Sequence, residues 1–455
     1  MTSPTEASPK VLQSDRERVD RRRVALYLSL YGILALAPLA LLFVPALPVA
    51  KGFWTEFSVA LGFAGLSLMG AQFIPTARLP IFADTFPSDT LYKHHRQAST
   101  LGFLLALAHP VILFASSPTS LALLDITSAP WRARAATVGV VLLIVLVVSS
   151  IWRTSMRLRY DVWRRLHTTL TLVVMALFVY HMFAVDRYVA NPAMRAYWII
   201  MIVIWALSVG YSRLVRPLDL ARRPWRVVEV RPELGNTNTV VLEPVRHRGL
   251  SFMAGQFGWL SVGKSPYTLS DNPFSFGSSA ETSGRLEFAI REAGDFTSSV
   301  PQLEVGALAY VDGPFGTFDL DQHTGPGYAF IGGGSGIVPI VSILRTMADR
   351  DDQTPAVLFY GNPDWESVTF REELDSLAGR LDLEIVHVLS IPPEGWTGET
   401  GFIDREILDR HLPAVRRNLQ YFICGPGPMI DAVEHALHEL EIPLGRVHSE
   451  NYKMA

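Results

Sequence analysis

Four histidines form two pairs with the same spacing in the most apolar half of the sequence. His95 and His109 are 14 residues apart, and so are His167 and His181. Fourteen residues of α-helix come within about 40° of four full turns, so each pair lies on one face with its members about 21 Å apart along the axis. Two imidazoles that face each other can bind one haem iron from both sides. The pattern predicts two stacked bis-histidine haem sites.

Two alternatives compete with this interpretation. A single histidine in an apolar helix usually forms a hydrogen bond to a neighbouring helix, but chance does not readily give the same spacing twice. His94 could replace His95 as a ligand, yet the residue 14 positions after it is Ala108. We therefore assign His94 to the membrane interface. Metal transport is the second alternative, and no Asp or Glu lies in the two apolar stretches that carry the pairs.

Six apolar stretches must position these histidines, and each approaches the ~20 residues that cross a bilayer as a helix. They cover residues 24–45, 54–74, 93–115, 134–152, 162–185 and 195–214. The third and fifth run in the same direction, which brings His95 level with His167 and His109 level with His181. The first stretch is too long for a signal-peptide core and has no small-residue cleavage site, so we expect it to be retained.

Basic residues are concentrated in alternate connections between these stretches. They are frequent in the N-terminal tail, after the second and fourth stretches and after the sixth, and sparse in the other connections. By the positive-inside rule, both termini and the whole second half of the chain lie in the cytoplasm. The prediction is a multi-pass protein of the plasma membrane.

Composition separates the chain into an apolar and a soluble half. Of the 455 residues 49% are hydrophobic and 18% charged, and the mean hydropathy is +0.24. The net charge of −3 gives no indication of nucleic acid as a partner. Cys424 is the single cysteine, which excludes an intrachain disulfide and a thiolate-bound metal cluster. The domains expected are a tail (1–23), a transmembrane domain (24–216), a β-barrel domain (217–322) and an α/β domain (323–455).

In the expected β-barrel domain, the residue types suit a flavin. Short β-type runs at 225–230, 239–242, 257–262 and 286–290 predict a small antiparallel barrel. A flavin requires an aromatic wall, a hydroxyl at the ring edge, and a cation with backbone N–H groups for its pyrophosphate. Phe274, Ser275, Arg291 and the turn from Gly294 to Thr297 could supply these groups.

After residue 323, strands and helices alternate. Strands at 328–331, 356–360, 383–388 and 420–424, separated by helices, predict a doubly wound parallel sheet. Two turns at the carboxyl ends of its strands are rich in Gly and Pro, which lets the backbone approach a nucleotide pyrophosphate. The first turn holds Gly332, Gly333, Gly334, Ser335 and Gly336, with Pro339 in the helix that follows; the second holds Cys424, Gly425 and Pro426.

Together these features resemble the ferric reductase and NADPH oxidase superfamily in a minimal, bacterial-type form. The likeness covers residues 24–452 and joins a ferric reductase-like six-helix haem bundle to a ferredoxin-NADP reductase-like module. Its motifs in the second half are the flavin sequence Asn272-Pro273-Phe274-Ser275; the pyrophosphate sequence formed by Arg291 with Gly294, Asp295, Phe296 and Thr297; the turn Asp312–Gly316; the nucleotide loop Gly332–Pro339; the turn Cys424-Gly425-Pro426; and the terminal Glu450-Asn451-Tyr452. Asn272 departs from the family's His or Arg, which leaves the pyrophosphate charge mainly to Arg291.

The resemblance implies electron transfer from cytoplasmic NADH or NADPH, through FAD and two b-type haems, to an external acceptor. It assigns Ser275 to the flavin N5, Cys424 to the nicotinamide and Tyr452 to the flavin face. The acceptor is O2, giving superoxide, or chelated Fe3+; an electron supply to a partner protein or quinone is the alternative. No regulatory subunit is implied. A transporter with a nucleotide-sensing domain would leave the histidine spacing unexplained. The sequence slightly favours NADH, because the segment after the strand at 356–360 is acidic.

Overall fold

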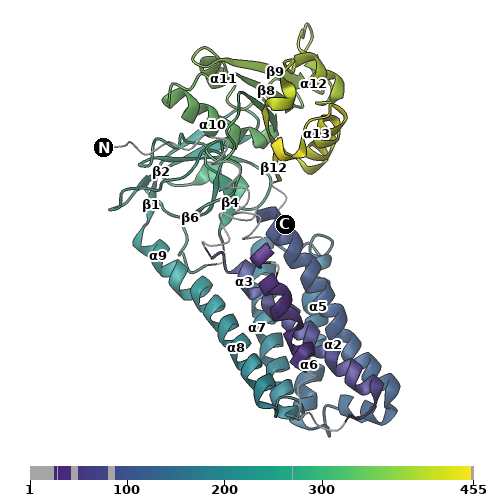
Figure 1. Ribbon diagram of the computed structural model, residues 1–455. Coiled ribbons are helices and arrows are strands. Elements are labelled where there is room, and N and C mark those ends of the chain that lie inside the picture. Colours follow the sequence, from purple (N-terminus) through teal and green to yellow (C-terminus); the bar gives the residue numbers. More distant parts are fainter. Residues whose placement is uncertain (1–24, 28, 42–49, 80–87, 269, 452–455) are drawn as a thin grey trace, which may run out of the picture. The chain divides into compact units, whose positions relative to one another are not determined.

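The computed structural model of the protein describes residues 25–27, 29–41, 50–79, 88–268 and 270–451. The chain divides into a helical unit, which includes Leu91–Leu214, and a second unit that includes Val215–Ala455. Figure 1 shows the helices of the first unit and the two sheets of the second.

Five helices in the described part of the chain are long and apolar enough to cross a membrane. The five are α2 (Phe53–Ala71) with its continuation α3 (Phe73–Thr76), α5 (Ser88–Ser116), α6 (Trp131–Ile151), α7 (Tyr160–Val185), and α8 (Pro192–Gly210), which runs through a π-helical turn into α9 (Arg216–Arg222). They coincide with the second to sixth predicted stretches. The first stretch is described as a shorter helix over residues 25–41, and its remainder lies outside the described residues.

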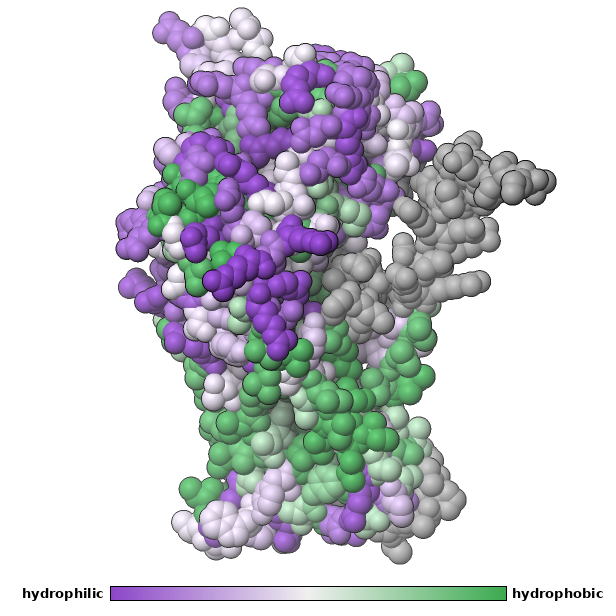
Figure 2. Space-filling model, turned by 90° about the vertical axis from the view of Figure 1, so that its left-hand side faces the viewer, coloured by the Kyte–Doolittle hydropathy of each residue, from purple (hydrophilic) through white to green (hydrophobic). Residues whose placement is uncertain are grey.

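Large aromatic and sulfur-containing side chains hold the helical unit together. On α8, Met194, Trp198, Met201 and Trp205 recur at helical spacing, and all are buried. Gly70 of α2 provides the space for one of these rings, because a Cβ at this position would lie 1.9 Å from the Trp205 ring. The side chains on the outer faces of the helices are largely apolar (Figure 2), as is required of helices that contact lipid.

The second unit begins with a curled antiparallel sheet of six strands. Its strands are β1 (Trp225–Glu233), β2 (Thr237–Pro244), β3 (Phe257–Val262), β4 (Asn272–Ser275), β5 (Leu286–Arg291) and β6 (Leu308–Phe315). They are ordered β4-β3-β6-β1-β2-β5, so the short β4 and β5 form the two edges. The predicted barrel is therefore a curled half-barrel, around a core that includes Phe276 and Phe288.

A parallel six-stranded sheet with helices on both faces completes the unit (Figure 1). Its strands are β7 (Tyr328–Gly333), β8 (Ala356–Asn362), β9 (Leu383–Leu389), β10 (Glu399–Thr400), β11 (Gln420–Gly425) and β12 (Val447–Asn451); its helices are α10 (Ile337–Asp349), α11 (Arg371–Ala378), α12 (Arg405–His411) and α13 (Gly427–Glu439). The order is β10-β9-β8-β7-β11-β12. The central strands are buried on both faces, which explains their continuous apolar sequences.

Candidate functional site

The first histidine pair, called the inner pair, consists of His95 on α5 and His167 on α7, and its two rings lie close together. The ring centroids of His95 on α5 and His167 on α7 are 6.4 Å apart. Two imidazoles bound to opposite sides of one metal ion through bonds of about 2 Å place their centroids about 6.3 Å apart. The buried Nδ1 of His95 has no hydrogen-bond partner among the described residues. The pair has the spacing that an axial-ligand pair requires.

The second histidine pair, called the outer pair, lies on an apolar cavity. His109 and His181 both line a space of about 410 Å3 between α2, α5, α6 and α7, within the range of about 300–1,000 Å3 that is usual for cofactor sites. Gly62 makes room for the first of them, because a Cβ at this position would be 3.1 Å from the His109 ring. Apart from the histidines, the lining is mostly apolar, which suits the faces of a porphyrin.

Neighbouring helices fix the orientation of three of the four imidazoles. The Nδ1–H of His109 donates to the Ser58 carbonyl at 2.9 Å, and that of His181 donates to the Arg132 carbonyl at 2.8 Å. The Nδ1 of His167 is 3.1 Å from Ser150 Oγ, which donates its own hydrogen to a carbonyl on α6 and therefore accepts from the ring. Each ring keeps Nε2 available, as metal-bound histidines do.

The His94 side chain contacts the first helix and is not part of either histidine pair. Its ring makes edge contacts with Tyr27 and Tyr31 of the first helix, at centroid distances of 6.4 and 4.8 Å. In the part of the chain that the structure describes, no three His, Cys, Asp or Glu side chains cluster in a way that could hold a metal ion.

The flavin sequence Asn272–Ser275 forms β4, at one edge of the half-barrel. Asn272, Pro273 and Phe274 are half-buried in β4, and Ser275 is buried. The Phe274 and Phe296 rings are 5.9 Å apart, so two members of different motifs come together. The structure thus joins both motifs through an aromatic contact.

The predicted pyrophosphate turn is closed by its own threonine. Thr297 Oγ1 accepts from the N–H groups of Ala293 and Gly294, both at 2.8 Å. Asp295 and Arg291 are exposed, and a Cβ on Gly334 would be 2.9 Å from Arg291 Nη1. The Arg291 guanidinium of the pyrophosphate motif therefore reaches the glycine loop of the parallel sheet.

The two Gly/Pro turns of the parallel sheet are in direct contact. Gly332 and Cys424 are paired neighbours on β7 and β11. A Cβ on Gly336 would lie 2.0 Å from the Cys424 carbonyl oxygen, and a Cβ on Gly333 would lie 3.1 Å from Pro426. Close backbone packing therefore requires a glycine at position 336, whatever the turns bind.

Several predicted residues of these turns are not exposed to a ligand. The side chain of Cys424 is fully buried in the core below the sheet edge, and Pro339 is buried in the first turn of α10. Gly425 is also buried, whereas Pro426 is exposed and Gly334 and Ser335 are half-buried. Gly332, Gly333 and Gly336 are buried as well, so the accessible part of the loop is at Gly334 and Ser335.

A chain of contacts connects the flavin motif with the C-terminal strand. Ser275 pairs with Phe257 on β3, which packs against Gly316. A Cβ on Gly316 would lie 3.4 Å from Glu450 Oε1 on β12, and Glu450 pairs with Cys424. The motifs therefore surround one region of this unit. Tyr452, predicted to cover the flavin, lies outside the described residues.

Tyr360 and Arg345 contact these motifs and were not singled out from the sequence. The Tyr360 hydroxyl donates to the Gly334 carbonyl at 3.4 Å, and burial raises the pKa of this phenol to about 12. Arg345 is bonded to the carbonyl of Gly277, two residues after Ser275. A signal was present, since Arg345 is the one charged residue in the segment 337–348.

Comparisons with known proteins agree with this division of the chain. Residues 61–179 match the family model of a ferric reductase like transmembrane component, and residues 330–435 match that of an oxidoreductase NAD-binding domain. The first match contains His95, His109 and His167 and ends two residues before His181, and the second contains the glycine loop and Cys424.

Curated relatives of the chain include fungal reductases. NADH-cytochrome b5 reductase 1 of Laccaria bicolor is 34% identical over 167 residues, which are 35% of this chain and 54% of the relative. The protein of the same name from Debaryomyces hansenii is 34% identical over 148 residues, 32% of this chain and 52% of the relative. The chain thus spans about half the length of these relatives. Among solved structures, the ferredoxin reductase in carbazole 1,9a-dioxygenase covers 50% of this chain and 69% of its own, with 26% identity and a TM-score of 0.45.

Proposed function

We propose that this chain, a ferric reductase/NADPH oxidase-type fusion of a ferric reductase-like transmembrane component with an oxidoreductase NAD-binding domain, carries electrons from a nicotinamide nucleotide across a membrane. Its activity is that of an NAD(P)H-dependent oxidoreductase, with FAD and two haems as cofactors. The observation that carries the proposal is the arrangement of His95, His167, His109 and His181. One pair has the centroid spacing of two axial ligands, and the other lines a cofactor-sized apolar cavity.

The chain's own residues have distinct tasks in this proposal. His95 with His167, and His109 with His181, hold two irons through Nε2, while Ser58, Ser150 and Arg132 fix the ring orientations. When bound, FAD would accept two electrons from the nucleotide and release them singly, and the haems would conduct them between the two sides of the membrane. If each histidine pair holds one iron, the acceptor would take its electron without binding that iron.

In the second unit, the residues of both motifs hold the nucleotide and the flavin. Phe274 and Phe296 provide an aromatic wall, Ser275 a hydroxyl near the ring edge and Arg291 a cation for the pyrophosphate. Gly334 and Ser335 offer half-buried backbone at the amino end of α10, where anionic groups are favoured.

The segment after β8 supports NADH as the donor. Arg371, the cation that could reach a 2′-phosphate, lies 4.8 Å above the Trp365 ring and donates to the carbonyl of the same residue at 3.3 Å. Asp364 and Glu366 flank that tryptophan. An acidic residue after a strand of this kind suits a ribose hydroxyl and repels a phosphate.

The test is anaerobic reduction of the purified full-length protein in detergent. NADH should bleach the flavin absorbance and then produce the Soret and α bands of reduced bis-histidine haem, and NADPH should do so at a lower rate. Oxygen with superoxide detection, and ferric citrate with Fe2+ detection, then identify the acceptor. A protein that binds neither flavin nor haem after supplementation during expression would refute the proposal. Reoxidation by neither acceptor would favour the supply of electrons to a partner protein or quinone.

A further inference from the structure

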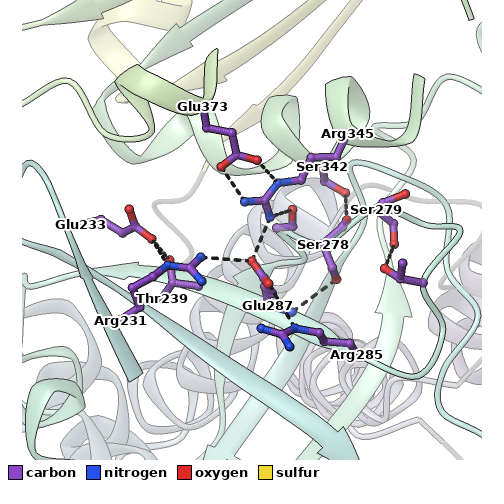
Figure 3. A network of polar contacts seen from close by, with 12 residues as sticks. Arg231, Glu233, Thr239, Ser278, Ser279, Arg285, Glu287, Ser342, Arg345 and Glu373 are labelled. Carbon is purple, nitrogen blue, oxygen red and sulfur yellow. Dashed lines mark hydrogen bonds and ion pairs between the residues drawn. The ribbon is translucent and has the colours of Figure 1, made fainter. Parts of the chain in front are cut away.

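A buried arginine connects the nucleotide-binding sheet to the half-barrel. Arg345 on α10 binds Glu373 on α11 through two hydrogen bonds of 2.6 and 2.8 Å. Its Nη1 donates to the Gly277 carbonyl at 2.6 Å and to Glu287 on β5 at 3.0 Å. The Arg345 guanidinium on α10 thus links α11 to Gly277 and β5 of the half-barrel (Figure 3).

Two further residues on the same face of α10 make contacts to the same segment. Ser342 Oγ donates to the Ser278 carbonyl at 2.7 Å. Thr346 Oγ1 accepts from the Ala280 N–H at 2.9 Å. Positions 342, 345 and 346 have the spacing of one helical face, so the whole face is bonded to residues 277–280.

The environment of Arg345 makes these bonds stronger than those of a surface ion pair. Its side chain is 15% exposed and that of Glu287 is 14% exposed. Although burial lowers the pKa of the guanidinium, its bonds to Glu373 and Glu287 raise that pKa above its ordinary value. The cations of the adjoining polar cavity, Arg231 and Arg285, are also paired with glutamates. The cluster is therefore a set of satisfied internal contacts.

The position of these contacts in the chain gives them a function. Residues 277–280 directly follow the flavin motif that ends at Ser275, and α10 directly follows the glycine loop that ends at Gly336. The bonded face of α10 therefore begins about two helical turns after the glycine loop. The segment that it binds begins two residues after the flavin motif. Reacting groups must approach to about 3–3.5 Å, and a displacement of about 1 Å can reduce a rate by roughly 10²-fold.

We propose that Arg345 is a positioning residue, which holds the glycine loop in register with the flavin motif by binding Gly277, Glu287 and Glu373 together. Ser342 and Thr346 support it. The inference rests on the proposed function, because it concerns the step between nucleotide and flavin. Arginine suits this task because its planar fork makes several directed bonds at once, which lysine cannot do.

The test compares Arg345→Met and Arg345→Lys with a matched control, Arg410→Met. Arg410 also binds a glutamate, Glu399, through two bonds of 2.5 and 2.6 Å, but both residues belong to the parallel-sheet layer. Stopped-flow reduction of the flavin by NADH gives the limiting rate and the apparent Kd separately. Flavin content and melting temperature are measured on the same full-length preparations.

In Arg345→Met the limiting rate should fall by roughly tenfold or more, while the apparent Kd for NADH stays within about threefold of the wild-type value. Arg345→Lys should be intermediate, and Arg410→Met should retain the wild-type rate. Flavin content should be unchanged in all three variants.

If Arg345→Met does not fold, Ser342→Ala serves instead, because it removes one bond to residue 278 without leaving a buried charge. It should lower the limiting rate in the same direction by a smaller factor. A wild-type limiting rate in a folded Arg345→Met protein, or in Ser342→Ala where that variant replaces it, overturns the positioning role alone, as does an equal loss in Arg410→Met. Absence of flavin reduction in the wild type overturns the proposed function and this inference with it.

Discussion

At the scale of single residues, hydrogen bonds decide which nitrogen each histidine presents. His109 and His181 donate Nδ1–H to carbonyl oxygens, which leaves both Nε2 atoms neutral and free to bind a metal. His94 has the same side chain and lies next to His95, yet its ring contacts two tyrosines. His94 and His95 are therefore adjacent histidines with different expected roles.

Replacing an outer histidine should remove one haem and leave the other. We expect His109→Ala to retain about half of the wild-type haem content, because an iron without one of its two axial ligands is held weakly. His94→Ala, the control, should retain all of it. The pyridine haemochrome assay on protein of known flavin content measures both. Full haem content in His109→Ala would exclude His109 as a ligand.

Asp319 is a buried carboxyl whose ionisation should affect stability. Its side chain is fully buried and accepts two hydrogen bonds of 2.9 Å from Gln322. Burial, assisted by the charge of Asp321, raises the pKa of Asp319 to about 7. Because the folded-state pKa exceeds the unfolded one, this contribution to stability is complete below about pH 4 and is lost as the pH rises through 7.

Asp319→Asn should therefore stabilise the protein at pH 8 by about 1–4 kcal/mol, with little effect at pH 4. The amide keeps an oxygen for Gln322 but carries no charge. Melting temperatures of the full-length variant and wild type at the two pH values provide the comparison. A gain of equal size at both would show that the carboxyl titrates normally in the folded state.

At the scale of elements, the two turns at the ends of β7 and β11 depend on each other. Gly336 has no space for a side chain, since its Cβ would meet the Cys424 carbonyl oxygen at 2.0 Å. The loop and the turn can keep their present backbone only if this position is glycine. Their shape is thus set by packing between neighbouring parallel strands, before any ligand is considered.

Gly336→Ala should consequently displace the loop and weaken NADH binding by roughly tenfold or more, while the flavin and haem contents remain. Gly284→Ala is the control, because a Cβ at that exposed position meets nothing within 4 Å. Titration of NADH against flavin fluorescence measures the Kd of both variants. Equal affinities in the two would mean that the loop does not contact the nucleotide.

At the scale of the whole molecule, the proposed function requires the nucleotide and the acceptor to be on opposite sides of a membrane. The basic connections predict that the segment between α6 and α7 is cytoplasmic and that the one between α5 and α6 is external. The protein has one cysteine, Cys424, and it is buried. Introduced cysteines can therefore be labelled selectively.

Thr119→Cys in the segment between α5 and α6 should react with a membrane-impermeant maleimide in intact cells. Ser155→Cys in the segment between α6 and α7 should react only after permeabilisation. Both positions are exposed, so a difference in labelling reports their side of the membrane. The opposite result would invert the orientation, and labelling of both in intact cells would mean that the two segments lie on the same side.

The sequence determined those features of this protein that depend on periodicity and local chemistry. Apolar runs of membrane length, the 14-residue histidine spacing and the Gly/Pro turns after buried strands each follow from the geometry of a single helix or strand. Five of the six predicted apolar helices, each long enough to cross a membrane, the parallel sheet and the likeness to the two family models were therefore predictable, and the structure and the comparisons agree with them. The cofactor assignments stay predictions.

The tertiary structure alone decided which residues meet. No local pattern relates Ser150 to His167, Gly336 to the carbonyl of Cys424, or Arg345 to Glu287, because these contacts join segments that are separated by 17 to 88 residues. Burial of the Cys424 thiol and the opening of the predicted barrel at β4 and β5 likewise depend on the packing of whole layers. Side-chain type and spacing specify the groups available for chemistry; chain topology specifies which of them share one place.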